Sequence, residues 1–599
     1  MKRGILFLIP IVLLVSTSIA QETIKVKIDA LVKNGVALKE KEKMQRFSEI
    51  YLEYQFQIHP EFGTFVGKTD NNNKWTDFSF EGMEQEKKDR VLLLNALKSI
   101  NRLKLDAAEQ LNYDLLKGTI ELEREGEVFQ SELMPIDQRY GFHHMIVRVL
   151  IATPIRSRKD VEDFLTRLQK TATLIDQLIL LMDKGIEKNI TAPKITLLDV
   201  PSQIQSIIGT EPAKSTLLKN LNAYLAKQSS EYKEQTLSKA LKITAEILYP
   251  SLSKLKTYIE KTYIPNARET IALKDLPNGE NWYNYKIKSH TTTSLTYKEI
   301  YEIGLSEVKR IRKVMDSIIK AIGFKGSSEE FASFLRTDRS FFYEDSAQLL
   351  DGYRVIAKKI DPQLPKLFGK LPRLSYGIEP VPAYEEKSKS SAYYVGGSTK
   401  AGRPGVFYAN TYNLMSRPKW EMEVLTIHEA VPGHHLQLSL QEELENVAEF
   451  RKYINYTSYA EGWGLYSESL GEEMGFYKDP YSKFGQLTYE MWRAVRLVID
   501  PGIHGLGWTR QQAIDYFIAN TAKSELEITV EVDRYIAQPG QALAYKIGEL
   551  KIQELRTEAQ MKLGDKFDIR QFHDVVLANG AIPLDILTQK VSEWINSIK

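Results

Sequence analysis

Residues 428–435 read His-Glu-Ala-Val-Pro-Gly-His-His, so three of the chain's nine histidines fall within eight positions. A glutamate directly after a histidine is the arrangement that zinc hydrolases use, because imidazoles bind the ion and the adjacent carboxylate serves as general base. The usual spacing is H-E-x-x-H on one helix, whereas here the fourth residue after His428 is Pro432. This departure determines how the surrounding chain must fold.

The helix that leads into this cluster must be interrupted at Pro432. A proline ring clashes with the carbonyl group four residues earlier, which is that of His428. In an unbroken helix His434 would lie about 240° around the axis from His428, and His435 about two turns away, so neither could share one ion with it. Pro432 and Gly433 therefore predict a break that folds His434 or His435 back towards His428. The alternative is that these histidines only pack around a kink.

A third ligand is expected from residues 457–475, which have helical periodicity. Three acids share the face opposite an apolar stripe: Glu461, Glu468 and Glu472. Three glycines line up beside the acids: Gly464, Gly471 and Gly475. Each glycine inside a helix costs about 1 kcal/mol relative to alanine, so this helix is expected to pass close to another backbone. An acidic stripe is usually a solvated face, but here we predict Glu461 as the carboxylate ligand and Glu468 as the residue that orients a ligand histidine.

The composition restricts the kind of metal site and the kind of partner. The chain has 80 basic and 78 acidic residues, and Lys2 and Arg3 alone account for the net charge of +2. Without them the chain is neutral, which gives no electrostatic argument for binding nucleic acid or an anionic membrane. There is no cysteine, so disulfides and thiolate ligands are excluded and any metal must be held by histidine and carboxylate.

The N-terminus has the pattern of a secretory signal peptide. Lys2 and Arg3 precede an apolar run over residues 5–15, and Ser18-Ile19-Ala20 offers small residues for cleavage after Ala20. We therefore expect an exported protein without a lipid anchor, in a bacterial periplasm. The alternative is a retained N-terminal anchor, for which the run is short.

The remaining pattern predicts a mainly α-helical, two-lobed fold around a deep cleft. Apolar residues recur at spacings of three and four in several segments: 85–120, 158–187, 296–322 and 541–562. Helix starts are marked by Ser157, Thr509 and Asp568. A small β-hairpin, or else an irregular loop, is expected at 391–410. After the signal peptide (1–20), we expect an N-terminal helical lobe over 21–290 and a C-terminal lobe with the metal site over 291–599.

Four motifs of the chain resemble a bacterial domain-of-unknown-function family, numbered 885. They are HEAVPGHHLQ (428–437), EGWGLY (461–466), PGIHGLGW (501–508) and RYIAQPGQALAY (534–545). The likeness spans most of the chain. The family is similar to helical zinc peptidases with a glutamate third ligand, such as oligopeptidases, thermostable carboxypeptidases and angiotensin-converting enzyme. Their common Gly-His ending matches Gly433-His434, with two residues inserted before it, which favours His434 as second ligand and leaves His435 to the outer shell. The spacing of Glu461 and Glu468 resembles the carboxypeptidase group.

The resemblance also implies oxyanion donors, for which related peptidases use tyrosine and histidine. We predict His504, Tyr535 or Tyr545 in this role, although any of them could be a core residue. Arg493 and Arg496 could hold a peptide carboxylate, or else pair with the acidic stripe.

Together these features predict an exported zinc-dependent peptidase that acts on short peptides. His428, His434 and Glu461 would hold one Zn²⁺ ion, and Glu429 would be the general base. The alternatives are a metal-dependent hydrolase of another amide or ester, and a catalytically silent periplasmic binding protein. The sequence indicates neither a nucleic-acid partner nor a membrane partner after signal cleavage, and it does not indicate the oligomeric state.

Overall fold

The computed structural model describes residues 15–34, 38–382, 386, 390–399 and 402–598. Most of the expected signal peptide, residues 1–14, lies outside the described residues. The chain forms two compact units. Unit 1 contains the residues up to Ala192, then Leu197–Ala267 and Ala448–Phe450. Unit 2 contains Pro193–Thr196, Arg268–Val447 and Arg451–Lys599.

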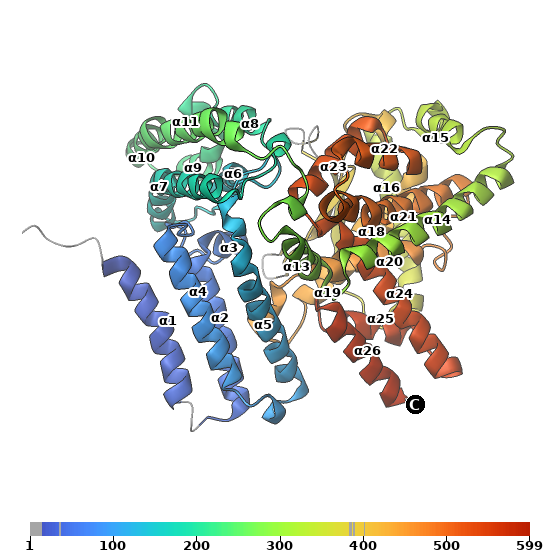
Figure 1. Cartoon of the computed structure of the whole chain (residues 1–599), viewed down its shortest axis with the longest axis horizontal. Coiled ribbons are helices and arrows are strands. Elements are labelled where there is room, and N and C mark those ends of the chain that lie inside the picture. Colours follow the sequence, from blue (N-terminus) through green and yellow to red (C-terminus); the bar gives the residue numbers. More distant parts are fainter. Residues whose placement is uncertain (1–14, 35–37, 383–385, 387–389, 400–401, 599) are drawn as a thin grey trace, which may run out of the picture. The chain divides into compact units, whose positions relative to one another are not determined.

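Unit 1 is entirely helical within its described residues (Figure 1). Its helices are α1 (Val15–Asn34), α2 (Glu40–Ile58), α3 (Pro60–Phe65), α4 (Phe80–Lys98), α5 (Ala107–Gly126), α6 (Phe142–Ala152), α7 (Arg158–Lys188), α8 (Val200–Ile208), α9 (Lys219–Leu225), α10 (Ser230–Ile243), α11 (Tyr249–Tyr258) and α12 (Ile264–Asn266). Helices α1, α2, α4 and α5 pack side by side. The predicted helix over 85–120 is two helices, because Asp106 starts α5 by accepting a hydrogen bond from the Glu109 amide.

Unit 2 contains the remaining helices and a small sheet. The helices are α13 (Gly279–Thr291), α14 (Tyr297–Ile322), α15 (Ser328–Thr337), α16 (Ser346–Ile360), α17 (Leu364–Leu367), α18 (Met422–Glu429), α19 (His434–Glu442), α20 (Thr457–Ser469), α21 (Pro480–Pro501), α22 (Arg510–Asn520), α23 (Glu525–Ala537), α24 (Ala544–Leu563), α25 (Ile569–Leu577) and α26 (Leu584–Ile598). Long helices α14 and α21 pack along each other around a shared apolar core. The predicted starts at Ser157, Thr509 and Asp568 are confirmed as N-caps.

The sheet has three strands in the order β1-β3-β2. Strands β2 (Ala392–Val395) and β3 (Gly405–Ala409) are antiparallel, with Tyr394 opposite Phe407. This confirms the predicted hairpin. Strand β1 (Tyr376–Pro380), which pairs with β3 in parallel, was not predicted.

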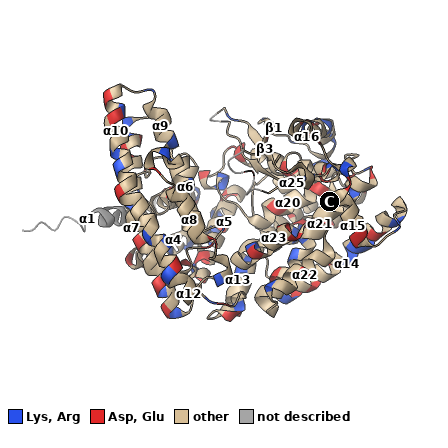
Figure 2. Ribbon diagram, turned by 90° about the horizontal axis from the view of Figure 1, so that it is seen from above, with Lys and Arg blue, Asp and Glu red and all other residues tan. Residues whose placement is uncertain are grey.

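The boundary between the units falls at 267/268 and not at the expected 290/291. The reason is helix α13, which packs against α20 and α24 of unit 2. Basic and acidic residues are mixed along the helices of both units, in keeping with the balanced composition (Figure 2). No helix of the described chain is both long and apolar enough to cross a membrane.

Candidate metal centre

The predicted helix break is confirmed between α18 and α19. Helix α18 ends at Glu429, the Val431–Pro432 peptide bond is cis, and α19 begins at His434. The Gly433 amide donates to the Ile427 carbonyl at 3.0 Å. A Cβ atom at Gly433 would lie only 1.9 Å from the His428 carbonyl oxygen, so the chain can double back this tightly only with glycine.

This turn brings His434 onto His428, with ring centres 4.7 Å apart and ring planes at 87°. Helix α20 supplies Glu461, whose Oε2 lies 3.7 Å from His428 Nε2 and 3.6 Å from His434 Nε2. These distances exceed those of direct hydrogen bonds. They are close to the roughly 3.4 Å that separates two ligand atoms of a tetrahedral zinc ion. His428, His434 and Glu461 therefore form the group of described residues that could hold a metal ion.

The electrostatics of this triad favour a cation. Burial alone would lower the pKa of His428, but the carboxylates of Glu461 and Glu468 outweigh it and raise that pKa to about 9. Burial likewise raises the pKa of Glu461, and the two facing imidazoles outweigh it and hold that pKa well below its ordinary value.

Glu468 contacts His428 as predicted, with its Oε1 2.7 Å from Nδ1. Glu468 is 1% exposed and lies two turns after Glu461 on α20. An acceptor at Nδ1 fixes the imidazole tautomer and leaves Nε2 free for a metal. The Trp463 indole donates to the Pro432 carbonyl at 2.8 Å and so ties α20 to the turn before His434.

Gly464 makes room for the ring of His428. A Cβ atom at this position would lie 2.8 Å from Cε1 and 3.1 Å from Nε2 of His428. The sequence predicted that this helix passes close to another part of the chain, and it predicted that Gly464, Gly471 and Gly475 together make this approach possible. Those two glycines follow the end of α20 at Ser469 and play no part in the helix. The second close glycine inside α20 is Gly462.

If the triad holds zinc, Gly464→Ala is expected to weaken its binding by at least about tenfold, because the added methyl group displaces the His428 imidazole from its place. Alanine is the better helix former, so a loss of helicity cannot explain the effect. Zinc affinity is measured by chelator competition. The matched control is Gly118→Ala inside α5, where nothing beyond the adjacent backbone of its own helix lies within 4 Å of the new Cβ. This variant should have the metal affinity of the wild type.

His435 turns away from the triad. Its Nδ1 lies 2.8 Å from the Tyr394 hydroxyl and 3.2 Å from Ser439 Oγ, and its ring packs on Tyr376 of β1. Burial lowers the pKa of His435 to about 4. The structure thus brings His434, and not His435, to His428 and Glu461. The His435 ring lies against the sheet, with Tyr376, Tyr394 and Ser439 as its side-chain partners, and not in the supporting role predicted for it.

His504 is also held by the fold. It is fully buried, its Nδ1 accepts a hydrogen bond from the Leu273 amide, and its Nε2 lies 2.9 Å from the Tyr535 carbonyl. With both ring nitrogens engaged by main chain, His504 connects the end of α21 to its neighbours. The structure does not bring it to the triad.

The turn after α21 also contains a buried carboxyl group. Asp500 is fully buried and accepts hydrogen bonds from the Tyr283 hydroxyl at 2.6 Å and the Gly540 amide at 3.0 Å. Burial outweighs these contacts and raises the pKa of Asp500 to about 7. In the unfolded chain the pKa is near 3.8. Between these two values the folded state binds the extra proton, so this group makes folding less favourable as the pH rises.

Asp500→Asn is expected to remove this pH dependence while keeping the polar contacts. As the pH rises from 5 to 8, the wild type should lose about 2–3 kcal/mol of its free energy of unfolding through this group, and the variant should not. The difference in stability between variant and wild type should therefore change by that amount between the two pH values. Urea unfolding at the two pH values, with chelator present, measures the difference. An equal difference between variant and wild type at both pH values would contradict an Asp500 pKa near 7.

The two tyrosines predicted as oxyanion donors differ in position. The Tyr535 hydroxyl accepts hydrogen bonds from Arg496 Nε at 3.0 Å and Trp492 Nε1 at 3.3 Å, and its side chain is fully buried. Tyr545, in the first turn of α24, is half-buried, and its pKa is raised by burial and by the charge of Glu461. Of these two, Tyr545 is the tyrosine whose pKa responds to the charge of a triad residue.

The arginines predicted to bind substrate are buried on α21. Arg493 is 7% exposed and Arg496 is 6% exposed. Arg496 pairs with Glu531 at 3.3 Å, and its guanidinium carbon lies 4.5 Å from the centre of the Tyr545 ring. Arg493 Nη2 lies 3.6 Å from Glu468 Oε1, which confirms for Arg493 the alternative prediction of a pairing with the acidic stripe.

Comparison with known proteins gives a consistent family assignment. A crystal structure described as "the putative lipoprotein from Colwellia psychrerythraea" is 28% identical, with a TM-score of 0.87, and the match covers 94% of this chain and 100% of that one. A second, from Shewanella oneidensis and described as "a putative lipoprotein of unknown function", is 17% identical with a TM-score of 0.71, covering 91% and 99%. No curated protein matches significantly.

The descriptions of both relatives as lipoproteins agree with the expectation of export and speak against the expectation that there is no lipid anchor. The sequence contains no cysteine. The family model described as "Bacterial protein of unknown function (DUF885)" matches residues 60–591. That range includes every residue of the triad and most of both units. The chain therefore belongs to the DUF885 family.

Proposed function

We propose that this protein is a zinc-dependent hydrolase of peptide bonds. The observation that carries the proposal is the donor set of two imidazole Nε2 atoms and one carboxylate oxygen, all within 4.8 Å of one another. Two imidazoles and a glutamate are the ligands of one class of catalytic zinc site. The fit is supported by the Gly464 recess around His428 and by Glu468 at its Nδ1. A bound zinc ion would supply Lewis acidity and lower the pKa of a water molecule.

The residues around this site have distinct proposed roles. Glu429, the last residue of α18, is half-buried, and its charge contributes to the raised pKa of His428. It is the general base that accepts a proton from the attacking water and passes it to the leaving amine. The Tyr545 hydroxyl is the donor to the developing oxyanion.

The limited access to the ligands supports a slender substrate. The side chains of His428, His434 and Glu461 are 5%, 15% and 23% exposed. An extended short peptide reaches such a recess more readily than the surface of a folded protein does. The signal-like N-terminus and the lipoprotein descriptions of the two structural relatives support export to the bacterial periplasm.

Metal analysis combined with peptide cleavage tests the proposal. The purified protein should contain one zinc ion per chain and cleave a library of short peptides, and chelation should abolish the cleavage. His434→Gln should lose zinc, whereas His435→Gln should retain it. Stoichiometric zinc without cleavage of any peptide would favour hydrolysis of another amide or ester, or a silent binding protein. A protein without metal affinity would contradict the proposal altogether.

A further inference from the structure

Glu468 is a carboxylate that needs a cationic partner. It is 1% exposed, and burying an unpaired charge is costly. Its Oε1 lies 2.7 Å from His428 Nδ1. Once His428 uses its other nitrogen for a metal, it offers Glu468 a hydrogen bond from a single N–H group. The buried charge then has to be balanced from elsewhere.

Arg493 is the group that meets this need. Its Nη2 lies 3.6 Å from the same Oε1 atom of Glu468. Among the described residues, His428 and Arg493 are the basic groups within 4.0 Å of this carboxylate. The distance of 3.6 Å is that of an ion pair and is too long for a hydrogen bond.

The guanidinium of Arg493 is itself held by its own helix. Its Nη1 donates to the Tyr489 carbonyl at 3.2 Å, and its carbon lies 4.8 Å from the centre of the Tyr489 ring. Arg493 is therefore a fixed charge on α21, buried beside the carboxylate of α20. A fixed and buried guanidinium is poorly suited to capture a mobile substrate carboxylate.

We propose that Arg493 is a positioning residue for the metal centre. It holds the Glu468 side chain with Oε1 towards His428 Nδ1, and Glu468 in turn keeps Nε2 of His428 aimed at the ion. The inference rests on the proposed function, because it assumes that the triad binds zinc. It replaces the expectation that Arg493 binds substrate.

A double-mutant cycle on zinc affinity tests this role. Chelator competition on the full chain gives the dissociation constant of zinc. We expect Glu468→Gln to weaken binding by about 10–100-fold, and Arg493→Met by about 3–10-fold. If Arg493 acts through Glu468, adding Arg493→Met to Glu468→Gln should cause little further loss. If the two losses of zinc affinity multiply in the double variant, the inference is overturned.

Arg496→Met is the matched control. Arg496 lies one turn later on α21, is buried to a similar degree and stacks on aromatic rings, but it pairs with Glu531. Any effect it has on zinc affinity should multiply with that of Glu468→Gln. A cycle in which Arg496 couples to Glu468 as strongly as Arg493 does would also overturn the inference.

A lysine variant covers the case in which the methionine variant does not fold. Arg493→Lys keeps the charge, so its zinc affinity should stay within about threefold of wild type, and its small loss should again vanish in the Glu468→Gln background. A multiplicative loss for lysine would overturn the inference while leaving the proposed function intact. A wild-type protein without zinc affinity would overturn both.

Discussion

Glu429→Gln is expected to lower kcat for peptide hydrolysis by about 10³-fold while zinc still binds stoichiometrically. Glutamine keeps the size and polarity of the side chain but cannot take up a proton, and general base catalysis contributes about 10²–10⁴-fold to such rates. Because Glu429 is not one of the three ligand candidates, the metal should remain. Zinc content and steady-state kinetics on the same preparation separate the two effects.

Glu423→Gln is the matched control for this substitution. Glu423 lies on the same helix α18, is also half-buried, and accepts a hydrogen bond from the Tyr477 amide at 2.8 Å, which glutamine can still accept. Its kcat should stay within a few-fold of wild type. If Glu429→Gln retains more than about a tenth of the wild-type kcat, Glu429 is not the general base.

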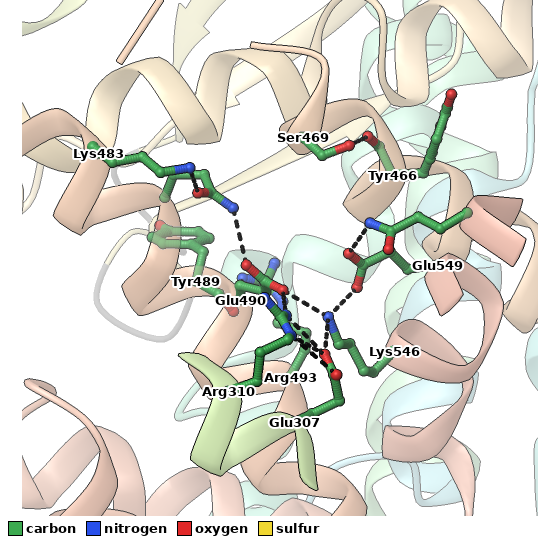
Figure 3. Close-up of polar contacts among 12 residues, drawn as sticks. Glu307, Arg310, Tyr466, Ser469, Lys483, Tyr489, Glu490, Arg493, Lys546 and Glu549 are labelled. Atoms are coloured by element: carbon green, nitrogen blue, oxygen red, sulfur yellow. Dashed lines mark hydrogen bonds and ion pairs between the residues drawn. The ribbon is translucent and has the colours of Figure 1, made fainter. Parts of the chain in front are cut away.

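Lys546→Met is expected to destabilise unit 2 by about 3–5 kcal/mol. Lys546 is fully buried in α24, and its ammonium lies 2.7 Å from Glu549, 2.9 Å from Glu490 and 3.1 Å from Glu307 (Figure 3). Arg310 also pairs with Glu307 and Glu490. Methionine fills a similar volume but removes the charge that these buried carboxylates surround.

Urea unfolding followed by tryptophan fluorescence measures the loss, because six of the seven tryptophans lie in unit 2. Lys551→Met is the control: Lys551 is on the same helix but pairs with exposed Glu554, so its removal should change the free energy of unfolding by less than about 0.5 kcal/mol. Adding Glu549→Gln to Lys546→Met should recover part of the stability. Equal effects of the two lysine variants would contradict a stabilising role for the cage, by which we mean Glu307, Glu490 and Glu549 around Lys546.

The pKa values of two carboxylates of the cage shift in opposite directions. Burial outweighs the attraction of Lys546 and raises the pKa of Glu549 to about 7, whereas Lys546 and Arg310 outweigh burial at Glu490 and lower its pKa to about 2. The cage joins α14, α21 and α24 directly after Tyr545. It therefore anchors the first turn of α24, which carries the candidate oxyanion donor.

The helix break and the carboxylate candidates could be predicted because the rules involved are local. Pro432 forbids a continuous helix whatever surrounds it, and helical periodicity alone places Glu461 and Glu468 on one face. The choice between His434 and His435 could not be made in this way. It depends on Tyr376 and Tyr394, which come from strands more than 35 residues away in sequence.

The auxiliary residues show the same limit. A histidine between glycines after a turn suggests an accessible loop, yet the carbonyl of Tyr535 and the amide of Leu273 enclose His504 from distant segments. Arg493 and Arg496 share a helix face in the sequence, but their different partners, Glu468 and Glu531, are set by how α21 packs. Local periodicity identifies which residues are candidates, and long-range packing decides what each one contacts.

The crossing of α20 and α24 limits which substitutions this protein can accept. At the crossing a Cβ atom on Gly462 would lie 2.6 Å from Gly548, and one on Gly548 would lie 1.8 Å from the Ser458 carbonyl oxygen. The spacing of the two helices is thus set by main-chain atoms, which every amino acid shares. A methyl group added at either glycine would force the two backbones apart and move Glu461 together with α20. The place of the ligand helix therefore leaves no room for a side chain at Gly462 of α20 or at Gly548 of α24.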